Sequence, residues 1–238
     1  MKKKSIIHII TRLLNGGADE NTVFSCNHSV SIGDDVTLII GQEQNKEILS
    51  KIDSRVSLVV VEDLIIEINP IKDLWALFEI KKIIKKISPN VVHTHTSKAG
   101  VLGRFAAWLS GTKLIIHTIH SLPFISANFF TKIFYLFIEK ITSLITHEFI
   151  NVSNGTKEIY LKYKIGNLSN HHVIYSAFDV EKFKNTNKHQ ALKDLNTDID
   201  LESAKIIIRM GRFEKLKGYR ELIETFNKIL LKFPNTVL

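Results

Sequence analysis

The sequence has little cysteine and no long hydrophobic run. Its 238 residues include one cysteine, Cys26, which excludes an internal disulfide and fits a reducing compartment such as the cytoplasm. No group of cysteines and histidines has zinc-finger spacing, and no apolar run approaches the roughly 18 residues that span a bilayer. At the start, His8 and Arg12 interrupt a lysine-rich apolar segment and no small-residue cleavage site follows. We therefore interpret this segment as a first strand rather than a signal peptide.

The sequence carries an excess of positive charge. Its net charge is +8 at pH 7 and its isoelectric point is about 9.4, a balance that suits nucleic acids, anionic membrane surfaces or phosphate-bearing substrates. The lysines lie in scattered pairs such as Lys81-Lys82, and no basic motif interleaved with aromatic residues is present. We therefore expect no nucleic-acid partner, which leaves phosphorylated substrates or a membrane surface.

Short β-rich runs alternate with amphipathic helical patterns along the chain. The clearest helix begins at Pro70 and ends before Pro89, with its apolar residues on one stripe. Alternation of strands and helices predicts an α/β fold, a Rossmann-like parallel sheet with helices on both faces. The predicted strands are Ser5–Ile10, Val36–Ile40, Val56–Val61, Val91–His95, Lys113–His117, Phe149–Val152 and His171–Ile174.

A polar segment divides the sequence into two domains. We predict an N-terminal domain over residues 1–183, a linker over 184–203, and the first β-α unit of a second domain over 204–238. The linker has a short helix predicted at Gln190–Leu195. The second domain has a strand at Lys205–Met210 and a helix at Tyr219–Phe233. Because a sheet needs about three strands to bury a face, we expect this Rossmann-like second domain to be truncated.

Chemically active side chains are concentrated between Val91 and Gly103. His93 and His95 alternate along a predicted strand, so they share a face near its carboxyl end, which borders the ligand crevice in open α/β sheets. Lys98 follows, and then a helix predicted at Val101–Leu109, whose free N–H groups suit an anion. The segment predicts recognition of a phosphorylated or hydroxyl-rich ligand.

Several motifs in a fixed order resemble those of a known family. They are Asn15-Gly16-Gly17-Ala18-Asp19, the run His93 to Gly103, His117-Thr118-Ile119-His120, Asn151-Val152-Ser153, Ile174 to Phe183, and Met210-Gly211-Arg212 with Glu214 and Lys217-Gly218. Together they resemble retaining nucleotide-sugar glycosyltransferases of the family 4, or group 1, type. That resemblance implies two facing Rossmann-like domains, the GT-B architecture, of the form seen in polysaccharide and lipid-carrier glycosyltransferases.

Two departures from the family pattern affect what is expected. Ser176-Ala177 stands where the family usually has Asn-Gly, so residues less suited to a positive φ make that turn. The paired glutamates that hold the sugar donor in the family lie beyond the equivalent of Leu238. We therefore expect most of the nucleotide pocket to be missing and the chain alone to be inactive.

The resemblance implies a catalytic contact between His95 and the transferred sugar, with His93 as the second candidate. A neutral imidazole offers one hydrogen-bond donor and one acceptor, which suits a sugar hydroxyl. Two alternatives remain: histidines that cap a strand end, and a metal site, whose third ligand the sequence does not place. His120 is a weaker candidate of the same kind. Lys98 contacts the acceptor or lies in solvent.

The resemblance also implies a site for the diphosphate of the sugar donor, formed by Gly16, Gly17, Arg212 and Lys217. The glycine turn lets a phosphate approach the backbone, although an ordinary strand-to-helix turn is an equal alternative. Arg212 and Lys217 stabilise the charge that grows on the leaving diphosphate, a role that magnesium has elsewhere, or they are solvated loop charges. We expect no metal and no cofactor.

The aromatic stripe between Asn128 and Ile145 favours packing in the core, with contact to a membrane as the alternative. We predict a cytoplasmic glycosyltransferase, with peripheral contact at the inner face of the membrane as an alternative. It transfers a sugar from a nucleotide-diphosphate sugar to a hydroxyl of a glycan or lipid-linked acceptor, with retention, in polysaccharide or cell-envelope synthesis. The alternatives are a sugar-nucleotide epimerase on the same fold, and a non-catalytic acceptor-binding remnant or subunit that needs a separate donor-domain polypeptide.

Overall fold

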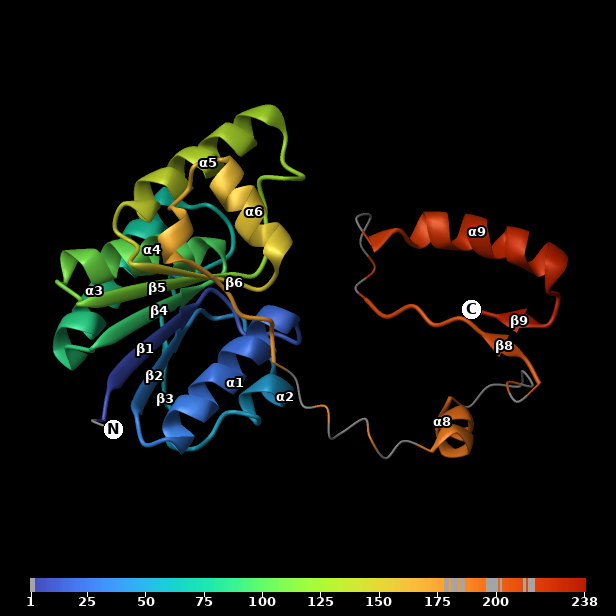
Figure 1. Cartoon of the computed structure of the whole chain (residues 1–238). Coiled ribbons are helices and arrows are strands. Elements are labelled where there is room, and N and C mark those ends of the chain that lie inside the picture. Colours follow the sequence, from blue (N-terminus) through green and yellow to red (C-terminus); the bar gives the residue numbers. More distant parts are fainter. Residues whose placement is uncertain are drawn as a thin grey trace. The chain divides into compact units, whose positions relative to one another are not determined.

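The chain forms two compact units, Met1–Phe178 (unit 1) and Asp179–Leu238 (unit 2). The structure is a computed structural model that describes residues 3–177, 180, 184, 187–195, 201, 203–211, 213 and 217–238 (Figure 1). The boundary between the units lies five residues before the predicted start of the second segment at residue 184. The division into domain, linker and incomplete domain stays a prediction.

Unit 1 contains a seven-stranded parallel sheet with the order β3-β2-β1-β4-β5-β6-β7 (Figure 1). This confirms the predicted α/β class and the Rossmann-like parallel sheet. The strands are β1 (Ser5–Ile10), β2 (Asp35–Ile40), β3 (Ser57–Val60), β4 (Val91–His95), β5 (Leu114–Ile119), β6 (Glu148–Asn151) and β7 (His171–Val173). Each lies within two residues of its predicted ends, because near-continuous apolar runs mark strands that a parallel sheet buries.

The order of the strands reverses between β1 and β4. The chain passes from β1 outward to β2 and β3, then returns to place β4 on the other side of β1. In open α/β sheets, ligands bind at such a switch point, outside the carboxyl ends of the strands. The residues that end β1 and β4 are therefore the ones that border a ligand site.

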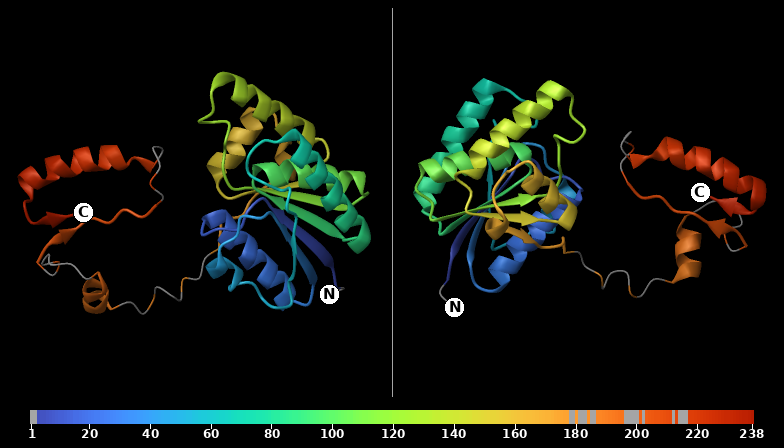
Figure 2. Two further views of the ribbon diagram at one scale, coloured as in Figure 1. Left: turned by 180° about the vertical axis from the view of Figure 1, so that it is seen from behind. Right: turned by 45° about the horizontal axis from the view of Figure 1, so that its top comes forward.

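Helices cover the two faces of the sheet unequally (Figure 2). The first face carries α1 (Gly17–Ser31) and the short α2 (Lys46–Leu49), which pack over β1 and β2. The second carries α3 (Pro70–Ile87), α4 (Ser97–Leu109), α5 (Phe129–Ser143) and α6 (Asn154–Lys162); a 3-10 turn, η1 (Leu168–Asn170), precedes β7. Ile7, Ile9, Val92 and Ile115 form the main core with α3 and α4, while Ile10, Leu38 and Ile40 pack against α1.

Helix α4 begins four residues earlier than predicted, at Ser97 rather than Val101. Glycine has low helix propensity, so the sequence pattern gave little sign of helix at Gly100. A side chain there would meet the ring of His117, since a Cβ on Gly100 would lie 2.6 Å from His117 Cε1. The close packing of α4 on the sheet therefore requires glycine and outweighs its propensity.

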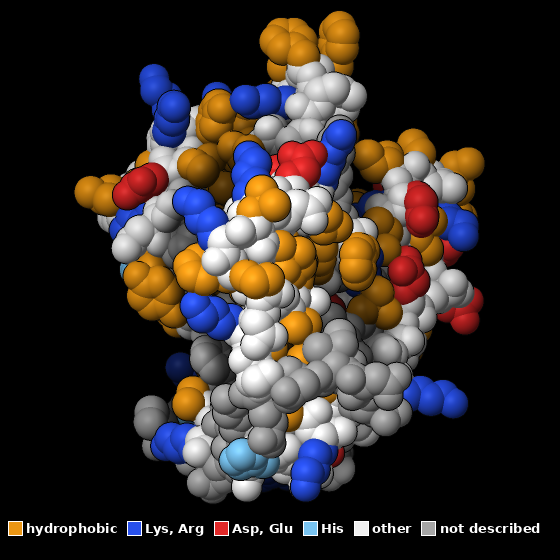
Figure 3. Space-filling view, turned by 90° about the vertical axis from the view of Figure 1, so that its right-hand side faces the viewer, with side chains coloured by type: hydrophobic (Ala, Val, Ile, Leu, Met, Phe, Trp, Pro, Cys, Tyr) orange, Lys and Arg blue, Asp and Glu red, His pale blue; other side chains and the backbone are white. Residues whose placement is uncertain are grey.

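The described residues of unit 2 form two short parallel strands and two helices. They are α8 (Lys188–Asp194), β8 (Lys205–Ile206), α9 (Tyr219–Lys232) and β9 (Thr236–Val237). The predicted strand Lys205–Met210 is thus only two residues long, and of its remaining apolar residues Ile208 and Met210 are exposed, whereas Ile207 is partly buried. Hydrophobic side chains lie among lysines and arginines on the surface that Figure 3 shows. Among the described residues, no helix is long and apolar enough to cross a membrane.

Candidate functional site

Two threonines join the carboxyl ends of β1 and β4 at the switch point. Thr11 Oγ1 lies 3.0 Å from Thr96 Oγ1 and accepts a hydrogen bond from the Ala99 N–H at 3.0 Å. Thr96 is the N-cap of α4 and has φ 60° and ψ 168°, a backbone conformation that a β-branched residue rarely adopts. Such strain persists where surrounding contacts enforce it and is concentrated at functional sites. The start of α4 is therefore held in a fixed position beside both strand ends.

Beside these threonines, three imidazoles form a hydrogen-bonded row that we call the histidine chain (His8, His95 and His120). His8 Nδ1 lies 3.0 Å from His95 Nε2, and His95 Nδ1 lies 3.1 Å from His120 Nε2. His8 and His95 are buried, whereas His120 is partly exposed at the end of β5. His93 lies alongside, with its ring centroid 4.2 Å from that of His95 and its Nε2 2.7 Å from Thr118 Oγ1.

Burial keeps these histidines uncharged. Loss of contact with water lowers the pKa of His8 and of His120 to about 4. It also holds the pKa values of His93 and His95 well below the ordinary value, with neighbouring histidines contributing to the same effect. A neutral imidazole has one N–H donor and one acceptor nitrogen. At neutral pH the hydrogen bonds of the histidine chain therefore all run in one direction.

A pocket of about 370 Å³ opens beside the two threonines, between α5 and the residues that precede α3, and none of these four histidines is among its lining residues. Thr11, Thr96 and Lys98 lie at its polar side together with Arg12, which makes no ion pair within the described residues. Its apolar lining consists of Ile66, Ile68, Val101, Leu102, Phe134 and Ile138. Two acidic residues, Asp73 and Glu139, also line the pocket, and each is held in an ion pair, with Lys98 and Arg104 respectively. The pocket is thus apolar along one side and polar, with Arg12, near the switch point.

The sequence profile of Glycosyltransferase Family 4 matches residues 19–182, well over half of the chain. The chain belongs to this family. The UDP-Gal:alpha-D-GlcNAc-diphosphoundecaprenol alpha-1,3-galactosyltransferase of Escherichia coli is 33% identical over 150 residues, which are 63% of this chain and 38% of that protein. The capsular polysaccharide biosynthesis glycosyltransferase CapM of Staphylococcus aureus is 25% identical over 232 residues, 89% of this chain and 59% of that protein. The chain thus spans less than two thirds of either relative.

Solved structures share the fold of this family 4 chain at low sequence identity. Anabaena HepE in complex with UDP and glucose superposes with a TM-score of 0.75 at 14% identity, over 98% of this chain and 60% of that one. A putative UDP-N-acetylglucosamine 2-epimerase of Listeria monocytogenes superposes with a TM-score of 0.65 at 14% identity, over 99% of this chain and 62% of that one. Both likenesses show the fold alone, so the match to the family profile is what favours a transferase.

The predicted site residues of this family 4 chain lie in different surroundings. His93, His95 and His120 come together at the switch point, and His8 joins them. From the sequence alone, His8 was noted only as a polar residue that interrupts an apolar strand and was not predicted as a site residue. His95 is fully buried and both of its ring nitrogens are hydrogen-bonded, so in this structure neither nitrogen is free for a sugar. The catalytic role predicted for His93 and His95 stays a prediction.

Lys98 is neither solvated nor free. Its Nζ donates to Asp73 Oδ1 at 2.6 Å and to the Glu67 carbonyl, and little of either charged side chain is exposed. The predicted alternative of a solvated lysine is therefore wrong. The ion pair ties the start of α4 to the start of α3, so Lys98 fixes one wall of the pocket.

The residues predicted to bind the diphosphate are placed only in part. Gly16 is extended, a Cβ on Gly17 would meet nothing within 4 Å, and the N–H groups of Gly17 and Ala18 have no partner in the described part of the chain. Lys217 is exposed in unit 2, where its carbonyl accepts from Arg209 Nη2 at 2.7 Å. Arg212 lies outside the described residues. Their common role stays a prediction.

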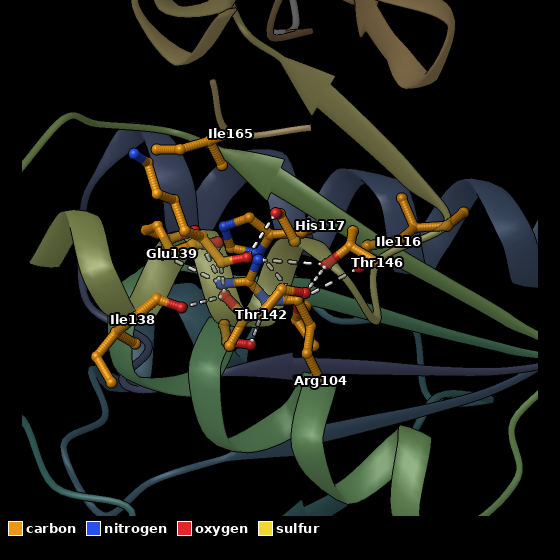
Figure 4. A network of polar contacts seen from close by, with 12 residues as sticks. Arg104, Ile116, His117, Ile138, Glu139, Thr142, Thr146 and Ile165 are labelled. Atoms are coloured by element: carbon orange, nitrogen blue, oxygen red, sulfur yellow. Dashed lines mark hydrogen bonds and ion pairs between the residues drawn. The ribbon is translucent and has the colours of Figure 1, made fainter. Parts of the chain in front are cut away.

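Most of the aromatic stripe of α5 is exposed, contrary to its predicted packing in the core, and the inward side of the helix combines polar residues with Tyr135 and Leu136. It buries Glu139 and Thr142, and the Glu139 carboxylate accepts two hydrogen bonds from Arg104 Nη2 at 3.0 and 3.1 Å (Figure 4). Its exposed apolar residues are Phe129, Phe130, Ile133, Phe134 and Phe137. Because the buried arginine of α4 demands a carboxylate partner, the phenylalanines face outward.

Proposed function

We propose that the chain is the acceptor-side part of a retaining glycosyltransferase. Such an enzyme transfers a sugar from a nucleotide-diphosphate sugar to a hydroxyl of a lipid-linked glycan, in polysaccharide or cell-envelope synthesis. The observation that carries the proposal is the two-sided pocket, apolar on one side and polar with Arg12 on the other, which opens at the switch point of a family 4 chain. The activities named for the relatives agree with this substrate class.

His120 is the group best placed to contact the transferred sugar. It is the partly exposed end of the histidine chain, and its Nε2 is held by His95. Its Nδ1 is therefore left for a sugar hydroxyl, while His95 and His8 fix the orientation of the ring. In this proposal His95 is a positioning residue rather than the group that contacts the sugar.

The amino end of α1 is the proposed site for the diphosphate of the sugar donor. The free N–H groups of Gly17 and Ala18 lie in the first turn of a 15-residue helix, where the helix dipole favours an anion. Arg212 and Lys217 complete this part of the proposal as cations that stabilise the leaving diphosphate.

The pocket suits the two chemically different parts of a lipid-linked acceptor. Its apolar side accommodates a hydrocarbon chain, while the Arg12 guanidinium, which has no ion-pair partner in the part of the chain that the structure describes, matches the oxygens of a phosphate or diphosphate linkage. The pocket itself contains no second unpaired cation among its lining residues, because Lys98 is held by Asp73. Arg12 is therefore the side chain that distinguishes a charged lipid from an uncharged one.

The purified chain is expected to bind a polyprenyl-diphosphate sugar, and Arg12→Ala is expected to weaken that binding about tenfold or more, because a charge-assisted hydrogen bond contributes roughly 1.5–3 kcal/mol. Isothermal titration calorimetry with a short-chain analogue measures the affinity. His120→Ala serves as the matched control and should bind the acceptor as the parent does, since His120 does not line the pocket. Equal affinity of the parent and Arg12→Ala for the charged lipid would contradict the proposed acceptor site.

An epimerase is the second candidate, favoured by the likeness to epimerase structures. Incubation with UDP-sugars alone distinguishes the two functions. A changed sugar configuration on the nucleotide, formed without any acceptor, would replace the transferase proposal. Acceptor binding without transfer, even when a donor-domain polypeptide is supplied, would instead support the non-catalytic alternative.

We further propose that α5 rests on an anionic membrane surface. Phe129 and Phe130 are 71% and 81% exposed at its start, and Phe134 both faces outward and lines the pocket. Exposed apolar groups gathered on one helix mark an interaction surface, and aromatic rings suit the membrane interface. The net charge of +8 is complementary to anionic lipids. A lipid-linked acceptor would then reach the pocket directly from the bilayer.

Replacing Phe130 and Phe137 together by serine is expected to lower binding to vesicles that contain anionic lipids about tenfold or more, since burying one phenylalanine contributes roughly 1.5–3 kcal/mol. Co-sedimentation with the vesicles measures the bound fraction. Phe213→Ser is the control, because Phe213 is even more exposed than Phe130 and Phe137 but lies in unit 2. Equal loss of vesicle binding in both variants would show non-specific hydrophobic adsorption. No loss in either variant would place the membrane contact elsewhere.

A further inference from the structure

His8, His93 and His95 form a compact group of three imidazoles within unit 1. One ring nitrogen from each lies within 4.8 Å of those from the other two. His8 and His93 are direct partners in the register of β1 and β4, and His95 follows two residues later on the same face. We propose that this group binds one transition-metal ion that prefers nitrogen ligands, such as Zn²⁺.

The spacing of one pair of nitrogens is near what such an ion requires. Zinc binds imidazole nitrogens at about 2.0–2.1 Å, which places two ligands of a tetrahedral site roughly 3.4 Å apart. His8 Nδ1 and His95 Nε2 are 3.0 Å apart, and all three nitrogens lie within 4.8 Å of one another. A metal would replace the hydrogen bond between His8 and His95 once the rings turn so that their nitrogens converge on the ion. Adjacent hydrogen-bonded strands hold the ligands in place beforehand.

The protonation and outer contacts of the rings suit metal binding. Imidazole binds metals in its neutral form, and burial keeps these histidines neutral at pH 7. Metal-binding histidines commonly donate a hydrogen bond from the N–H of their second ring nitrogen to a fixed partner, and this bond orients the ring. His93 Nε2 has Thr118 Oγ1 as that partner, and His95 Nδ1 has His120 Nε2. Hydrogen bonds on the side away from the proposed ion therefore already orient two of the three rings.

A groove of about 340 Å³ provides a route to the group. It runs between α1 and the open part of the first sheet face, and both His8 and His93 line it. Three protein ligands leave one position of a tetrahedral ion for water or a small anion, and the groove supplies the space for it. His28 also lines this groove but belongs to α1 and lies outside the group of three.

The proposed site differs from the sequence-based expectation that no metal is bound, which rested on the lack of a third ligand and stays a prediction. His8 is that ligand, brought beside His93 by strand pairing across 85 residues of sequence. The inference does not depend on sugar transfer, since it concerns only binding of the ion. Loss of metal binding and loss of acceptor binding are therefore separable results.

The test uses the untagged chain, stripped with a chelator and titrated with ZnCl₂ at pH 7.5 by isothermal titration calorimetry. We expect one ion per chain. His8→Phe should weaken binding at least 100-fold, since loss of even an outer partner of a ligand costs 10–100-fold. His28→Phe, in the same groove, should bind as the parent does. Titration with Co²⁺ should give the visible absorption of a tetrahedral ion in the parent and in His28→Phe only.

Circular dichroism establishes that each variant is folded. If His8→Phe does not fold, His93→Gln is used instead, because His93 is partly exposed. The same loss of zinc affinity is expected for it. Absence of stoichiometric binding would overturn the inference and leave the three rings as a purely hydrogen-bonded group. Binding that persists unchanged in both His8→Phe and His93→Gln would show an adventitious ion held by other histidines, and would overturn it equally.

Discussion

Glu139→Gln is expected to destabilise unit 1 by about 3–5 kcal/mol, because it leaves the guanidinium of Arg104 buried without a counter-charge. Arg104 is fully buried, and besides Glu139 it donates only to neutral oxygens, the Gly100 carbonyl at 2.8 Å and Thr146 Oγ1 at 3.4 Å (Figure 4). Urea unfolding followed by tryptophan fluorescence measures the change. Both tryptophans, Trp75 and Trp108, lie in unit 1, so the signal reports that unit alone.

Two comparison variants make the result specific. Asp53→Asn breaks the exposed pair with Arg55 and should change stability by less than about 1 kcal/mol. The double variant Arg104→Met with Glu139→Leu removes both charges, and we expect it to recover most of the loss, since apolar replacement of a buried pair is often neutral. A single Glu139→Gln variant as stable as Asp53→Asn would show that water reaches Arg104 and that the pair is not buried in solution.

Lowering the pH from 7 to 5 is expected to destabilise unit 1 strongly. The pKa of His8 and of His120 is about 4 in the folded chain, against about 6.5 when unfolded, because burial disfavours the charged form. The unfolded chain therefore binds more protons in this window, so stability is complete above the unfolded pKa and falls as the pH drops toward 4. Each such histidine contributes a loss of about 2 kcal/mol between pH 7 and 5.

The loss of stability at low pH arises from several interacting histidine rings rather than from independent ones. Burial also lowers the pKa of His93, His95 and His117, and Arg104 adds to the effect on His117. Urea unfolding across the pH series, again followed by tryptophan fluorescence, measures how the free energy of unfolding changes with pH. His8→Phe should make this change smaller, whereas His189→Gln in α8 of unit 2 should leave it the same. A parent chain with equal stability at pH 7 and pH 5 would mean that these rings are hydrated.

Much of the fold could be predicted from periodicity, and the exceptions have identifiable causes. Apolar runs indicated every strand of the sheet, and Pro70 marked the start of α3 where the structure has it. Helix α5 was harder, since its sequence shows an apolar stripe but not which way that stripe faces. The direction depends on Arg104, which lies 35 residues away from Glu139 and whose burial the local pattern does not reveal.

The candidate site could be located from the sequence but not assembled. Alternation along β4 placed His93 and His95 on one face at the correct strand end. The contribution of His8 depends on strand order, because only the placement of β1 next to β4 brings its ring to theirs. The pairing of Lys98 with Asp73 likewise joins two helices whose relative position no local pattern fixes.

The one-way hydrogen bonding of the histidine chain links events at its two ends. A metal on His95 Nε2 would keep the His95 proton on Nδ1, where it is donated to His120 Nε2. The proton of a neutral His120 must then be on Nδ1, so the ring offers the incoming sugar a donor and never an acceptor. Without the metal, the whole row can reverse by shifting one proton on each ring, and His120 then offers an acceptor. An ion bound on the groove side of the sheet would thereby determine whether His120 offers a sugar hydroxyl a hydrogen-bond donor or an acceptor.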